Sequence, residues 1–195
     1  MRDHRNGLIH AALGCILLAT VTLTGCSEQH ETRITSPTSS AGETPPELPP
    51  IGPEDILMPE EAREKTPDGA ESFVRYYFDL VNRMSTTLDA RPLRQLSADC
   101  QGCDRIASNA ELSARSGYRY EGGEITLTEV APPLVTGDQA EVTLRLDQTA
   151  LAVLDASGAR LERGSSDAFV GVPADVTLAW DPTSTSWRMT SLTFG

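Results

Sequence analysis

The spacing of the apolar residues changes once along the chain, and this change constrains the fold more than any other feature. Between residues 66 and 116, apolar residues recur every three or four positions, which indicates helices with one buried face. From residue 125 onward they alternate with polar residues, as in antiparallel strands that bury one side. Helices followed by strands predict an α+β fold, with N-terminal helices packed on one face of a curved antiparallel sheet.

The first predicted helix begins at Thr66, whose side chain can cap it, with Pro67 at the first helical position. A short second helix is expected over residues 89–97 and a third over residues 102–116, where Gly117 ends it. The apolar stripe of the first helix consists of Phe73, Tyr77, Leu80, Val81, Met84 and Leu88.

Polar and apolar residues alternate in four later stretches, at residues 125–128, 142–147, 176–180 and 187–192. Sequences typical of turns separate them at residues 136–138, 155–158 and 181–184. We therefore expect a meander of four to six strands.

The first 25 residues have the regions of an export signal. Arg2 and Arg5 precede an apolar run over residues 8–21, which is shorter than the roughly 20 residues that span a bilayer. The stretch LTGC at residues 23–26 resembles the lipobox of bacterial lipoproteins. This resemblance implies cleavage before Cys26, acylation of that residue with chains such as palmitate, and anchoring at the extracytoplasmic face of the cell membrane. The alternative is an ordinary secretory signal with an incidental cysteine.

Residues 26–57 are predicted to form a disordered tether, and residues 58–195 a single domain. The tether is rich in Pro, Ser and Thr and has few large apolar groups, so that it cannot offset the entropy of ordering. The 138 residues that follow suffice for one domain with its own core.

The composition argues against several classes of function. Loss of residues 1–25 leaves 14 basic and 27 acidic residues, a net charge of −13, without a basic run, which argues against nucleic acid as a partner. The predicted domain lacks histidine, so Ser-His-Asp and Cys-His catalysis are not expected. No catalytic, cofactor-binding or metal-binding residue is assigned. The only lysine, Lys65, is expected to pair with Glu61 at the i,i+4 spacing.

Two cysteines three positions apart, in the stretch LSADCQGCDRI at residues 96–106, allow three interpretations. A zinc site would have to recruit Asp99 and Asp104, a poor match for a structural site. A redox pair needs a reactive thiolate, but the same two acids would raise the pKa of the thiols. No βαβ pattern, as in a thioredoxin-like fold, precedes the pair. We favour a structural disulfide between Cys100 and Cys103 in an oxidising compartment, with Gly102 letting the backbone bend.

Three stretches carry a resemblance to a known family: MPEEAREKTPDGAESFVRYYFDLVNRM, LRQLSADCQGC and AWDPTSTSWRMTSLTF. They resemble a family of uncharacterised lipoproteins common in actinobacteria, and the likeness covers essentially the whole predicted domain. The order of helices and strands is also similar to the cone-shaped nuclear-transport-factor-2-like (NTF2-like) architecture, which hosts enzymes, carriers and inert modules alike. The family implies no activity that can be carried over.

Three functions follow as hypotheses. The first is a non-enzymatic module of the cell envelope that binds another protein, or an apolar ligand in a pocket between helices and sheet. The second is an enzyme with a tyrosine and a carboxylate in that pocket, for which the candidate tyrosines are Tyr76, Tyr77, Tyr118 and Tyr120. The third is a thiol–disulfide oxidoreductase that uses Cys100 and Cys103.

Overall fold

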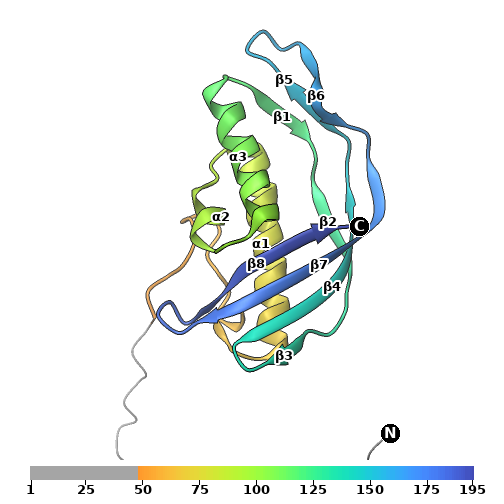
Figure 1. Cartoon of the computed structure of the whole chain (residues 1–195). Helices are drawn as coiled ribbons and strands as arrows, with labels where there is room; N and C mark the ends of the chain where they lie inside the picture. The colour runs from red at the N-terminus through yellow and green to blue at the C-terminus, as the bar shows by residue number, and fades with distance from the viewer. Residues whose placement is uncertain (1–47) are drawn as a thin grey trace, which may run out of the picture. The chain divides into compact units, whose positions relative to one another are not determined.

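The computed structural model describes residues 48–195, in which the helices precede the strands (Figure 1). A 3-10 turn, η1 (Glu61–Arg63), is followed by the helices α1 (Pro67–Thr87), α2 (Arg91–Gln95) and α3 (Gln101–Arg115). The predicted signal peptide, the lipidation of Cys26 and residues 27–47 of the predicted tether lie outside the described residues.

Helix α1 forms as its sequence predicts. The Thr66 hydroxyl accepts a hydrogen bond from the backbone N–H of Gly69 at 3.0 Å, and Pro67 occupies the first turn. The apolar stripe is buried from Phe73 to Met84, whereas Leu88 is the left-handed C-cap and is only partly buried. Tyr76 and Phe78 beside the stripe are buried as well, because α1 is covered on more than one side. Helix α2 lies inside its predicted range of 89–97. Helix α3 begins and ends one residue before its predicted bounds of 102 and 116.

The strands form two antiparallel sheets instead of one meander. They are β1 (Arg119–Gly122), β2 (Ile125–Val130), β3 (Leu134–Thr136), β4 (Gln139–Gln148), β5 (Leu151–Leu154), β6 (Arg160–Ser166), β7 (Phe169–Asp181) and β8 (Ser186–Phe194). The larger sheet has the order β2-β4-β7-β8, with β3 also paired to β4, and the smaller has the order β1-β5-β6. The α+β class is confirmed, whereas the meander is wrong, because β4 pairs with β7, while the intervening β5 and β6 pair with each other and β5 also pairs with β1.

The core lies between the helices and the inner face of the larger sheet, and Figure 1 shows α1 and α3 on the same side of that sheet. Trp187 on β8 is fully buried, and its indole N–H donates to the carbonyl of Glu64 at 2.9 Å. The connection between α2 and α3 pairs with the outer edge of β8, where Ala98 donates to Met189 and Met189 donates to Leu96. This pairing holds the start of α3 close to β8.

Residues 48–57, assigned above to the tether, pack on the domain in the structure, and we call them the N-terminal strap. Ile51 and Ile56 are partly buried against the core. The Tyr76 hydroxyl donates to the carbonyl of Ile56 at 3.0 Å, and the Arg63 guanidinium donates to the carbonyl of Pro49 at 2.7 Å. The two isoleucines supply apolar surface that composition averaged over the whole segment conceals, and the prolines restrict the unfolded backbone.

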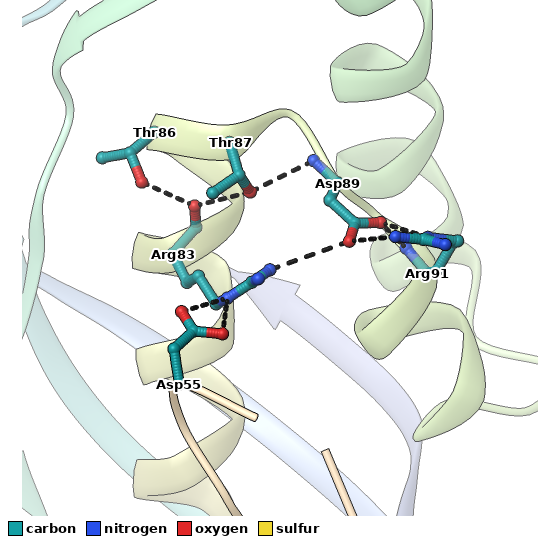
Figure 2. Close-up of polar contacts among 6 residues, drawn as sticks. All are labelled: Asp55, Arg83, Thr86, Thr87, Asp89 and Arg91. Atoms are coloured by element: carbon teal, nitrogen blue, oxygen red, sulfur yellow. Dashed lines mark hydrogen bonds and ion pairs between the residues drawn. The ribbon is translucent and has the colours of Figure 1, made fainter. Parts of the chain in front are cut away.

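An ion-pair network fixes the strap to the end of α1 (Figure 2). The Arg83 Nε donates to both carboxylate oxygens of Asp55, at 3.0 and 2.8 Å, and its Nη1 lies 3.8 Å from the carboxylate of Asp89. Hydrogen bonds from the Arg91 side chain lower the pKa of Asp89 to about 2. The strap therefore belongs to the folded unit.

Lys65 pairs with Asp138 in the turn between β3 and β4, and not with Glu61 as the spacing predicts. Lys65 precedes α1, while Glu61 lies in η1, so the two are not neighbours on one α-helix. Within residues 48–195, no helix is long and apolar enough to cross a membrane.

Candidate functional site

The two cysteines of the predicted domain form a disulfide at the start of α3. Cys100 is the N-cap of the helix, and its Sγ accepts a hydrogen bond from the backbone N–H of Cys103 at 3.2 Å. The Cα atoms of the pair are 5.2 Å apart, and each residue is only 1% exposed. Because both sulfurs are buried, the thiolate of an exchange partner cannot reach them without local opening. This burial argues against the oxidoreductase hypothesis.

Gly102, between the two cysteines, has a different role from the one expected. It lies inside α3 with a helical backbone, and the left-handed residue of the turn is Asp99, with φ of 53°. A Cβ atom on Gly102 would overlap the carbonyl oxygen of Leu192 on β8. Glycine is thus needed for the close approach of α3 to β8, and not for a bend.

Removal of the disulfide is expected to lower stability modestly. In the chain-entropy model, closing a four-residue loop is worth about 2 kcal/mol, and serine at position 100 retains an N-cap acceptor. We expect Cys100→Ser combined with Cys103→Ser to lower the free energy of unfolding by about that amount in thermal melts. A reductant should lower the melting temperature of the wild type alone. Rapid alkylation of both cysteines in native, unreduced protein would contradict the bridge.

A pocket of about 530 Å³ lies between the helices and the smaller sheet. Figure 1 shows the elements that enclose it, with α3 and β1 beside β5 and β6. Most of its wall is apolar, formed by Val81, Met84, Ile106, Leu112, Ile125, Leu151, Val153 and Phe194. Two of these side chains, Leu112 and Phe194, are 57% and 40% exposed, so the apolar surface continues to the outside of the domain.

Asn82 on α1 holds β2 against the helix at the wall of the pocket. Its amide donates to the carbonyl of Ile125 at 2.9 Å and accepts from the N–H of the same residue at 2.8 Å. These two hydrogen bonds satisfy both the N–H and the carbonyl of Ile125, whose side chain lines the pocket. The separation of helix and strand is therefore set by a polar contact as well as by packing.

Two of the four candidate tyrosines line the pocket, and two do not. Tyr118 and Tyr120 line it, and the Tyr120 hydroxyl lies 2.8 Å from that of Ser113. The Tyr76 hydroxyl is engaged by the strap. Tyr77 is fully buried in the core, where burial raises its pKa to about 12.

The polar groups of the pocket are neutral apart from one arginine. Among the described residues that line it are Ser85, Asn109, Ser113 and Gln148, and its only charged residue is Arg163 on β6. A carboxylate beside a tyrosine, which the proton-transfer hypothesis requires, does not occur among those lining residues. No group of His, Cys, Asp and Glu within residues 48–195 is arranged to hold a metal ion.

Sequence reasoning missed the part of the pocket that comes from β1, β5 and β6. Strand β6 reads RLERGSS and is mostly exposed, so it has no clear alternation. The sequence signal that was available is the glycine pair Gly122-Gly123, which indicates a sharp change of chain direction. In the structure both residues have positive φ, between β1 and β2. A Cβ on Gly122 would overlap the carbonyl oxygen of Ala150, so this passage crosses close to the start of β5.

Comparisons with known proteins agree with this architecture. The model of a family of unknown function, DUF6318, matches residues 57–193. No curated protein matches the sequence. The structure is similar to the intermembrane space region of the chloroplast protein ARC6, with 15% identity and a TM-score of 0.47 over 65% of this chain and 93% of that one.

Two further solved structures are similar. An NTF2-like superfamily protein from Salmonella enterica has 14% identity and a TM-score of 0.37, over 58% of this chain and 81% of that one. A conserved protein from Planctomyces limnophilus has 12% identity and a TM-score of 0.41, over 65% of this chain and 98% of that one. At these identities the likeness concerns the fold alone.

Proposed function

We propose that this chain, which belongs to the DUF6318 family of unknown function, is a non-enzymatic binding protein that holds a small apolar molecule between its helices and its smaller sheet. The observation that carries the proposal is the pocket of about 530 Å³ with its largely apolar wall. Small-molecule sites are commonly clefts of about 300–1,000 Å³ with apolar walls and a few polar groups.

The polar groups of the pocket support binding over proton transfer. A general acid or base must lie within hydrogen-bond reach of the substrate, and carboxylates are absent from the described residues that line the pocket. The Tyr120 hydroxyl already contacts Ser113 and the carbonyl of Asn109. These groups can orient a ligand without transferring a proton to it.

The second part of the proposal concerns location. We propose that acyl chains on Cys26 anchor the protein at the extracytoplasmic face of the cell membrane, and that residues 27–47 connect this anchor to the domain. The support is the order of positive region, apolar run and lipobox-like LTGC in residues 1–26. The ligand would therefore be met outside the cytoplasm.

Binding of a neutral apolar dye tests the first part. N-phenyl-1-naphthylamine should bind the protein saturably at one site, detected by its fluorescence. Asn109 is exposed on α3 and lines the pocket, so Asn109→Trp should place an indole in the pocket and weaken dye binding by about tenfold, or roughly 1.4 kcal/mol. The experiment uses the chain from residue 26 with Cys26→Ser, so that no acyl chain competes.

A matched variant identifies where the dye binds. Ala114 is exposed on the same helix but does not line the pocket, so Ala114→Trp adds the same bulk elsewhere and should leave dye affinity unchanged. Equal affinities of wild type and both variants, or no saturable binding at all, would show that the pocket does not hold apolar molecules.

A further inference from the structure

Arg163 is placed unusually for a charged residue of this domain. It projects from β6 as the only charged side chain among the described residues that line the pocket. Some other arginines are held by carboxylates, such as Arg83 by Asp55 and Arg94 by Asp104 and Glu111. Others within residues 48–195, such as Arg105 and Arg160, have no such partner but do not line the pocket. The Arg163 side chain makes no hydrogen bond or ion pair with any other residue in the range 48–195. Its guanidinium is therefore available to a ligand.

The net negative charge of the chain makes an unpaired arginine in the pocket a local site that can attract an anion. Acidic residues exceed basic ones by 12 in the whole sequence, so the average potential around the protein repels anions. An unpaired guanidinium beside an apolar wall is a local exception to that average. Arginine presents several N–H donors in a planar fork, which matches the two oxygens of a carboxylate.

From this we infer that the ligand of the pocket is an apolar molecule with one acidic group, of which the apolar body contacts Ile125, Leu151 and Val153 and the acidic group contacts Arg163. The inference rests on the proposed function and names its ligand class. Tyr118 lines the same pocket, and its hydroxyl also has no hydrogen-bond partner within the described residues. It can donate a further hydrogen bond to the acidic group.

Two dyes that differ by one group test the inference. 1-Anilinonaphthalene-8-sulfonate is N-phenyl-1-naphthylamine with an added sulfonate, an anion that stands in for the acidic group. Arg163→Met should weaken binding of the sulfonate dye by about threefold to tenfold, as expected for a partly exposed ion pair, and leave the neutral dye within about twofold. Arg163→Lys should restore part of the affinity, because it keeps the charge.

Arg160→Met is the matched control, because Arg160 lies on the same strand, is exposed and does not line the pocket. It changes the net charge equally and should leave both dyes unaffected, with melting curves confirming that each variant folds. The inference is overturned if Arg163→Met leaves the sulfonate dye unchanged, or if both arginine variants weaken it equally. Failure of the neutral dye to bind wild-type protein would instead overturn the proposed function, and this inference with it.

Discussion

Cys26→Ala is expected to move nearly all of the protein from the membrane fraction to the soluble fraction. Each buried methylene of an acyl chain contributes about 0.8 kcal/mol, so two or more chains hold a protein lastingly where one chain does not. The acidic chain has no electrostatic attraction to anionic lipids that would replace the chains. Cell fractionation measures the distribution, and intact mass measures the acyl groups on the wild type.

Cys15→Ala is the control for this experiment. Cys15 lies in the apolar run of the predicted signal, which the proposed processing removes, so its loss should change neither the distribution nor the mass of the mature protein. Retention of Cys26→Ala protein at the membrane would show that something other than acylation anchors it.

Gly102→Ala is expected to lower the free energy of unfolding by about 3 kcal/mol, because forcing a methyl group into a packed contact displaces backbone. The added Cβ overlaps the carbonyl oxygen of Leu192 and lies 3.1 Å from its carbonyl carbon, and neither atom belongs to a flexible side chain. Alanine's better helix propensity, worth about 1 kcal/mol, offsets only part of the cost. For a domain of this size the melting temperature should fall by roughly 10 °C.

Gln101→Ala, one residue earlier and exposed, should change stability by less than about 0.5 kcal/mol. A Gly102→Ala protein as stable as the wild type would mean that α3 does not approach β8 as closely as the structure shows.

Local features of the sequence predicted the helical half of the fold well. Thr66 and Pro67 are adjacent to the helix that they start, and the stripe from Phe73 to Met84 repeats at the helical period, so both signals are complete within one segment. The inward positions 142, 144 and 146 of β4 follow equally from alternation. The predicted turn at residues 155–158 also separates two strands, β5 and β6.

Local sequence features did not predict which strands pair or where the pocket lies. Alternation identifies which side chains share a face, but it does not identify the neighbouring strand, so the separate sheet of β1, β5 and β6 was not predicted. The pocket draws residues from elements far apart in the chain, such as Met84 on α1, Leu112 on α3 and Arg163 on β6. The strap was misassigned because two isoleucines in a proline-rich segment acquire a buried environment only when α1 is already folded.

Residue patterns within single segments were sufficient for the α+β class, the start and buried face of α1, the inward side chains of the long strands and the expectation of a paired Cys100 and Cys103. These are properties of residues close together in the chain, where period, capping and spacing act directly. The folded structure was needed to show which strands pair, why Gly102 must lack a side chain and that Arg163 lines an apolar pocket. These properties depend on contacts between distant segments, and such contacts arise from packing that no single stretch of sequence contains.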